Sequence, residues 1–123
     1  MNNRFDDDNL RPLSQLEREY LDRLLSAEFT GRAELIEQVR SARVRTIDSD
    51  GSIQIEPHTT TLATVVNRIP VEAEATDEDG VPIYFLLHAV DGRVQELEIY
   101  KADGSLIRKR PSAEELQVVV LAP

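Results

Sequence analysis

The chain has 123 residues, of which 41% are apolar and 30% charged, and its formal net charge is −9. This length and balance predict one soluble domain with a single hydrophobic core. No apolar run approaches the about 18 residues of a membrane span. The sequence contains no cysteine, which excludes disulfides, thiol nucleophiles and thiolate metal sites and fits a cytoplasmic protein. Residues 1–9 are polar and acidic and lack the apolar segment of a secretory leader, so we expect a disordered tail followed by a single domain at residues 10–123.

The negative charge is concentrated in one part of the chain. Residues 44–123 carry 14 acidic and 7 basic side chains, whereas residues 14–43 are nearly balanced, with 6 and 5. Proteins that bind nucleic acids normally use clustered Lys and Arg, so we expect no nucleic-acid partner. The charge favours a basic protein as the partner, although an acidic surface can also serve solubility alone.

Two helices are expected after the tail. Ser14 and Glu17 match a capping box, in which each side chain accepts from the backbone of the other residue, so a helix should begin here and end near Ala27. A break around Gly31 precedes a second helix over residues 32–42, which has its own apolar stripe. Because the connection is short, the two helices should form a hairpin that presents a joint apolar face.

Beyond residue 43, apolar and polar residues alternate, which is typical of strands. Residues 44–47 and 52–56 should form a hairpin in which Val44 lies opposite Ile55. The acidic loop between them superficially resembles a calcium-binding loop. It lacks the distal glutamate of an EF-hand, so we interpret it as a turn.

The centre of the expected sheet is a long hairpin, residues 81–90 and 93–101. Its loop is Asp91-Gly92, and Asp-Gly suits a type I′ turn because both central residues need positive φ. The apolar composition of the first strand predicts that both of its faces are packed. Further expected elements are a strand at 68–76, a strand at 105–108, a helical turn at 111–115 and a β-rich segment at 118–121. The fold class is therefore α+β, with the N-terminal helical hairpin packed on one face of a mainly antiparallel five- or six-stranded meander sheet.

Continuing the strand pairing outward from these loops assigns side chains to the two faces of the sheet. Leu86 should pair with both Val71 and Leu97, and the helices should cover that face together with a buried His88. The opposite face should carry the residues that we assign to partner binding: Glu72, Glu74, Phe85, Leu87, Glu96, Glu98 and Tyr100.

In this expected surface, Phe85 lies between Glu72 and Glu98 and forms an apolar anchor flanked by carboxylates. Such an arrangement suits a basic partner, because the carboxylates steer it and the aromatic ring is desolvated on contact. The alternative is that the C-terminal segment folds over Phe85 and Leu87 and that Lys109 pairs with Glu98.

Several short motifs of the chain resemble a family of small, functionally uncharacterised bacterial domains. The motifs are Leu10-Arg11-Pro12-Leu13 with Glu17, Gly31, Gly51-Ser52, Ile69-Pro70-Val71-Glu72, Leu87-His88, Glu96-Leu97-Glu98-Ile99 and Lys101-Ala102-Asp103-Gly104-Ser105. The resemblance covers about residues 10–110 and implies a bacterial source and an α+β fold. Its motifs specify structure rather than chemistry, so it implies no activity.

The sequence does not indicate catalysis. The chain has two histidines, His58 and His88, and it lacks Gly-rich phosphate loops, nucleophile elbows and zinc-ligand spacings. We therefore assign no catalytic residue, no cofactor and no metal site. The leading hypothesis is a small bacterial binding protein, of immunity or antitoxin type, that neutralises or regulates a basic protein through the acidic-apolar sheet face. The alternative is a domain that binds a small cationic ligand or a metal ion with the glutamates of that face, with hydrolytic activity.

Overall fold

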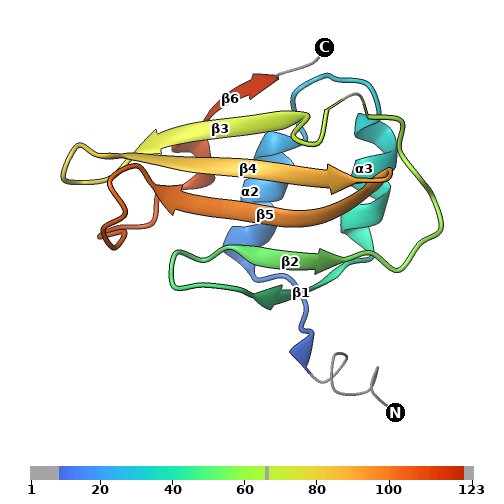
Figure 1. Ribbon diagram of the computed structural model, residues 1–123, viewed down its shortest axis with the longest axis horizontal. Helices are drawn as coiled ribbons and strands as arrows, with labels where there is room; N and C mark the ends of the chain where they lie inside the picture. The colour runs from blue at the N-terminus through green and yellow to red at the C-terminus, as the bar shows by residue number, and fades with distance from the viewer. Residues whose placement is uncertain (1–8, 66, 121–123) are drawn as a thin grey trace.

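The fold is a sheet with two helices packed behind it (Figure 1). The computed structural model describes residues 9–65 and 67–120, so the expected acidic tail, apart from Asn9, lies outside the described residues. The helices are α2 (Gln15–Leu24) and α3 (Arg32–Arg40), and both end earlier than predicted. The strands are β1 (Arg43–Thr46), β2 (Ile53–Glu56), β3 (Val71–Thr76), β4 (Pro82–Val90), β5 (Arg93–Lys101) and β6 (Gln117–Val120).

The sheet order is β1-β2-β5-β4-β3-β6, and every neighbouring pair is antiparallel. The α+β class is confirmed, with β3, β4 and β5 forming a meander at the centre. The first hairpin has the predicted register, since Val44 lies opposite Ile55. Within the described ranges, none of the helices combines the length and apolar character needed to cross a bilayer.

The helix α2 begins at the predicted capping box. The Ser14 hydroxyl accepts from the Glu17 N–H at 3.2 Å, and Glu17 Oε1 accepts from the Ser14 N–H at 2.9 Å. Arg11 donates to both oxygens of Glu17 at 2.8 Å, which the sequence did not indicate. Burial alone raises the pKa of Glu17, but the hydrogen bonds from Arg11 and Ser14 outweigh it, so the pKa lies below its ordinary value.

The central hairpin turns at Asp91 and Gly92, whose φ angles are 52° and 80°. Both are positive, as the predicted type I′ turn requires. The turn is also covered from outside, because the Ala63 N–H donates to the Gly92 carbonyl at 2.9 Å. A Cβ atom at Gly92 would lie 2.8 Å from the Ala63 carbonyl oxygen, so glycine is needed here both for its backbone angle and for space.

A buried glutamine joins helix α3 to this turn. The Gln38 side chain donates to the carbonyls of Thr61 and Gly92, each at 2.8 Å, and accepts from the Val94 N–H at 2.7 Å. Gln38 is fully buried, and these bonds satisfy both ends of its amide. One side chain therefore fixes the helix, the loop before β3 and the start of β5 relative to one another.

The strand β4 is paired one residue out of the predicted register on both sides. The loop before it is one residue longer than expected, since the Asp77 N–H donates to Val81 and the ladder resumes at Pro82. Val71 consequently lies opposite Leu87, where the prediction placed Leu86. The predicted start of β3 at residue 68 is also wrong, because the strand begins at Val71.

On the other side of β4, the ladder is interrupted by a β-bulge. Ala89 pairs with Val94, as a two-residue turn requires, but His88 pairs with Glu96 and not with the predicted Gln95. Gln95 is the extra residue of β5, and it is exposed. The bulge shifts all later pairs of the hairpin by one position.

These two shifts exchange the faces of β4, because successive side chains of a strand point to opposite sides. Phe85 and Leu87 are fully buried on the helix side, where the ring of Phe85 lies 4.8 Å from the ring of Tyr20. The predictions that Phe85 and Leu87 lie on the open side and that His88 is covered by the helices are therefore wrong. So is the expectation that both faces of β4 are packed, since its outward residues are half-buried.

The predicted strand at 105–108 does not form, and side chains hold this segment instead. Lys101 is buried, and its Nζ atom lies 2.9 Å from Oδ2 of Asp77 and 2.6 Å from Oδ2 of Asp79. Asp77 accepts from the backbone N–H groups of Arg108 and Lys109 at 2.7 and 3.0 Å. Burial raises the pKa of Asp77, but these hydrogen bonds together hold it well below its ordinary value.

The C-terminal part returns to the sheet. The predicted helical turn is the short 3-10 helix η1 (Ala113–Glu115), with a capping box between Ser112 and Glu115. Tyr20 donates to the Pro111 carbonyl at 2.7 Å, and burial raises the pKa of Tyr20 to about 12. The β-rich segment that follows forms β6, which pairs with β3 at one edge of the sheet.

Candidate functional site

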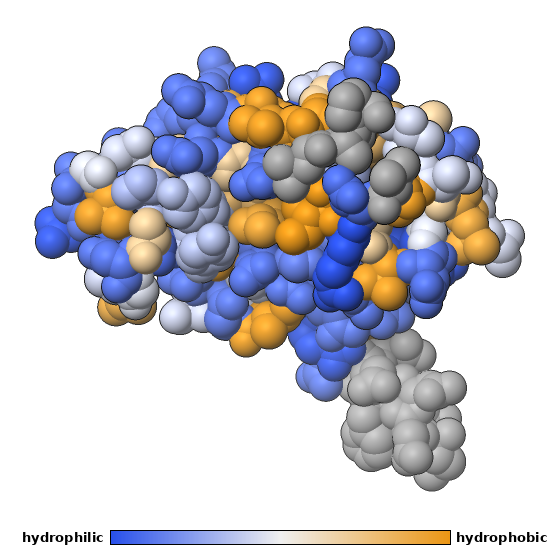
Figure 2. Space-filling view, turned by 45° about the horizontal axis from the view of Figure 1, so that its top comes forward, coloured by the Kyte–Doolittle hydropathy of each residue, from blue (hydrophilic) through white to orange (hydrophobic). Residues whose placement is uncertain are grey.

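The face of the sheet opposite the helices is not covered by any described element, and we call it the open face. In Figure 1 both helices lie behind the sheet, so the open face is turned toward the reader. The residues of β2 to β6 on this face include Gln54, Glu72, Glu74, Tyr84, Leu86, His88, Glu96, Glu98, Tyr100, Gln117 and Val119. Arg45 of β1 also lies on this face, opposite Gln54. Figure 2 views it obliquely together with the top edge, and shows apolar side chains in the middle of the view with hydrophilic ones around them.

A row of side chains crosses the middle of the open face. Leu86 on β4 lies directly between Glu72 on β3 and Glu98 on β5. Val119 on β6 extends the row beyond Glu72 and is 52% exposed. The sequence predicted this row with Phe85 in place of Leu86, so the two carboxylates flank an apolar side chain as expected, but a different one.

Two tyrosines form the next row. Tyr84 and Tyr100 pair across β4 and β5, with ring centroids 5.3 Å apart and an interplanar angle of 40°. Glu74 lies on the other side of Tyr84. Burial raises the pKa of Tyr100, and the negative charge of Glu98 adds to this effect, so its phenol stays protonated at neutral pH and can donate a hydrogen bond.

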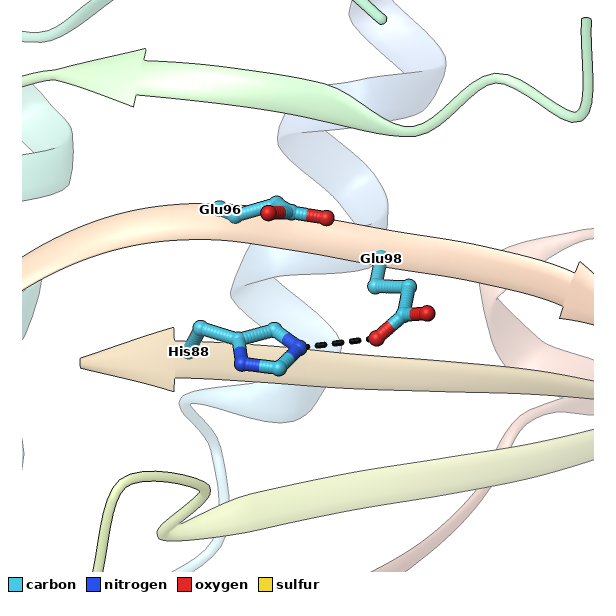
Figure 3. A group of neighbouring side chains, drawn as sticks. All are labelled: His88, Glu96 and Glu98. Carbon is cyan, nitrogen blue, oxygen red and sulfur yellow. Dashed lines mark hydrogen bonds and ion pairs between the residues drawn. The ribbon is translucent and has the colours of Figure 1, made fainter. Parts of the chain in front are cut away.

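His88 lies in the third row, in a chain of three polar side chains. Arg68 Nε donates to His88 Nδ1 at 3.1 Å, and His88 Nε2 lies 2.8 Å from Glu98 Oε1 (Figure 3). An arginine can only donate, so Nδ1 is the acceptor and the proton of the neutral imidazole is on Nε2, from which it is donated to Glu98. The side chain of His88 is 12% exposed.

Glu96 completes a group with His88 and Glu98. It lies directly opposite His88 in the ladder, and Figure 3 shows all three side chains on the same side of β4 and β5. One nitrogen or oxygen of each residue can be chosen so that all three lie within 4.8 Å of one another. The carboxylate of Glu96 makes no hydrogen bond or ion pair with any residue that the structure describes.

Five of the seven predicted site residues share the open face: Glu72, Glu74, Glu96, Glu98 and Tyr100. The two that do not are Phe85 and Leu87, which belong to the core. The alternative pair of Lys109 and Glu98 does not occur among the described residues, where the carboxylate of Glu98 bonds to His88.

Sequence reasoning missed Tyr84, Leu86 and His88 as residues of the open face. A signal was present in β4, where the alternate positions differ in polarity. The inward set is Ile83, Phe85, Leu87 and Ala89, which is wholly apolar, whereas the outward set contains a histidine and a tyrosine. Partition by polarity within the strand was therefore more informative than counting residues outward from the loops.

Comparison with known families assigns most of the chain to a family. Residues 10–111 match the family described as a domain of unknown function, DUF6984. No curated protein and no solved structure is significantly similar to the chain.

Proposed function

The chain belongs to the DUF6984 family, and for this member we propose a binding function: its open face docks a basic protein. The partner is neutralised or regulated by this contact, as a toxin is by its immunity protein. The setting that we propose is the bacterial cytoplasm, where the absence of cysteine has no cost for stability.

The observation that carries the proposal is the row in which Leu86 lies between Glu72 and Glu98. An apolar side chain between two carboxylates combines a surface that gains free energy on desolvation with charges that select a cationic partner. The tyrosine pair of the next row enlarges the apolar centre, and Tyr100, at 39% exposure, remains accessible. Tyrosine rings suit this role because they are rigid and offer both an apolar face and a hydroxyl.

The charge balance also supports a basic protein as the partner. Residues 44–123, which include the whole sheet except Arg43, carry 14 acidic and 7 basic side chains, so their surroundings attract basic proteins over a distance of about 8–10 Å at ordinary salt. On the open face, Glu72, Glu74 and Glu96 make no ion pair with a described residue. Their charge is therefore available to a partner.

The test purifies any basic protein encoded by the genes adjacent to that of this chain and measures its binding to the chain by biolayer interferometry at two salt concentrations. Leu86→Ala should weaken binding by about 2 kcal/mol, which is roughly 30-fold, mainly through faster dissociation. The double variant Glu72→Gln and Glu98→Gln should slow association and reduce its salt dependence. The matched control is Glu28→Gln with Glu37→Gln, which removes two exposed carboxylates away from the open face.

Thermal unfolding of each variant checks that the fold is retained. Leu86 is half-buried at the surface of the sheet, so its truncation should leave the domain folded. An affinity that is equal in wild type, Leu86→Ala and the Glu72 and Glu98 double variant contradicts the proposal. So does a loss of affinity of the same size in the control.

A further inference from the structure

We propose that His88, Glu96 and Glu98 bind one divalent first-row metal ion on the open face, and we take zinc as the example. The site shares Glu98 with the row of Glu72, Leu86 and Glu98, but Leu86 and the tyrosines take no part in it. It contains one imidazole nitrogen and two carboxylates, a donor set that zinc binds in proteins.

The backbone brings the three ligands together through the bulge. If the same sequence formed an unbroken ladder, Gln95 would lie opposite His88, and Glu96 would point into the core. The bulge instead places Glu96 opposite His88 and leaves Glu98 diagonal to it on the same face (Figure 3). Bulges often re-aim a side chain at a functional position, and here the re-aimed side chain completes the set of three ligands.

The distances require little adjustment. With ligand bonds of 2.0–2.2 Å, neighbouring donor atoms on a tetrahedral zinc ion lie about 3.4 Å apart. His88 Nε2 and Glu98 Oε1 are already 2.8 Å apart, and one ring nitrogen of His88 and one carboxylate oxygen each of Glu96 and Glu98 lie within 4.8 Å of one another. Rotation of the flexible Glu96 side chain closes the remaining distance, and the ion keeps an open position toward solvent for water.

Electrostatics also favours a cation at this place. The carboxylates of Glu96 and Glu98 are neighbours, and only Glu98 has a hydrogen-bond partner among the described residues. A divalent ion between the two carboxylates attracts both, and the attraction is stronger where the side chains are half-buried.

Arg68 opposes metal binding in the present arrangement. A histidine that ligates a metal through Nε2 carries its proton on Nδ1 and donates it to an acceptor. Arg68 presents a donor to Nδ1 instead, at 3.1 Å, so the metal must displace the arginine. Arg68 is exposed and can turn away into solvent. The residue thus sets the affinity of the site without touching the ion.

The experiment is a calorimetric titration of zinc into the metal-free, untagged full-length chain at pH 7. His88→Gln and Glu96→Gln should each weaken binding at least about tenfold, because each removes a ligand. Glu74→Gln removes a carboxylate of the same face outside the group and should change the affinity less than about twofold. Arg68→Gln should strengthen binding several-fold, since it replaces a competing donor by a side chain that can accept from Nδ1.

A second readout uses the two histidines of the chain. In the NMR spectrum of the wild type, zinc should shift the imidazole signals of His88 and leave those of His58, which lies in the exposed loop after β2. Unchanged His88 signals at saturating zinc overturn the proposal, as does equal zinc affinity in Glu96→Gln and Glu74→Gln. Leu86→Ala distinguishes partner binding from zinc binding, because it should weaken the binding of the basic partner and leave the zinc affinity unchanged.

Discussion

Glu96 lies directly opposite His88 across β4 and β5, although an unbroken ladder from the Asp91-Gly92 turn would place Gln95 there. The bulge that accommodates Gln95 keeps Glu96 and Glu98 on the open face. Residues beyond the bulge keep their apolar set inward, since Leu97 and Ile99 are buried. The hydrophobic pattern therefore requires the bulge. Val94 and Leu97 are both buried although they are three positions apart, and in an unbroken strand such residues point to opposite faces.

The first prediction concerns this extra residue. Deletion of Gln95 should give an unbroken ladder in which Glu96 still lies opposite His88, because every later residue keeps its face. Deletion of Glu96 gives the same ladder with Gln95 in that position. We expect both variants to fold with stabilities within about 0.5 kcal/mol of each other.

The two deletions should differ in zinc affinity by at least about tenfold, because only the variant that lacks Gln95 retains the carboxylate opposite His88. Urea unfolding and zinc calorimetry measure the two quantities. Failure of both variants to fold would show that the sheet needs the local twist of the bulge. Equal zinc affinity would remove Glu96 from the site.

The second prediction concerns the central turn. Gly92→Val should lower the free energy of unfolding by at least about 3 kcal/mol, because the positive φ is unfavourable for a branched residue and the Cβ atom meets the Ala63 carbonyl. Gly104→Val is the control, since Gly104 has a φ of 77° but an added Cβ meets no atom within 4 Å. It should cost only the backbone strain, about 1–2 kcal/mol. Similar losses in urea unfolding would show that space at Gly92 is unimportant.

The third prediction concerns the buried amide. Gln38→Met keeps the volume but leaves the Val94 N–H and the Thr61 carbonyl without their partner, so it should destabilise the domain by about 2–4 kcal/mol. Gln15→Met, at an exposed position of α2, is the matched control and should change stability by less than about 0.5 kcal/mol. Chemical unfolding compares the two, and a loss below 1 kcal/mol in Gln38→Met would contradict the role of the amide.

The fourth prediction concerns acid. The pKa of Asp77 is lower in the folded protein than in the unfolded chain, so the ionised carboxylate stabilises the fold. This contribution to the free energy of unfolding is fully present above the ordinary carboxyl pKa of about 4. It is lost as the pH falls from there toward the pKa of the folded protein. The free energy of unfolding should therefore fall steeply in this range. Asp77→Asn should be less stable than wild type at pH 7, and the difference should shrink as the pH falls. Asp22→Asn, on the exposed side of α2, should follow the wild-type curve.

The sequence predicted the local features whose cause lies in a few neighbouring residues. The capping box, the type I′ turn and the pairing of Val44 with Ile55 are confirmed, because each depends on a short pattern with one physical solution. The prediction of which β4 side chains face the helices was wrong, because it depends on the register on both sides of the strand. The loop after β3 is one residue longer than expected, and β5 contains one extra residue, Gln95. Neither leaves a clear mark in composition, and with a period of two any one-residue error reverses the result.

The missing strand at 105–108 has a different reason. The segment is β-compatible, but Asp77 lies far away in the sequence and takes the N–H groups of Arg108 and Lys109 that a ladder would use. The buried Lys101 was likewise unexpected, since lysine is seldom fully buried without partners. For the candidate site, the acidic residues were identified and the apolar and histidine positions were not, because only the latter lie on β4.

The order of the strands also determines when the sheet can close during synthesis. β1 and β2 leave the ribosome early, yet β2 pairs on its other side with β5, which is made after β3 and β4. Until β5 arrives, the apolar Ile53 and Ile55 lie on an unprotected edge. Non-local pairing of this kind slows folding, because the chain between β2 and β5 must be closed into a loop before the two strands can pair.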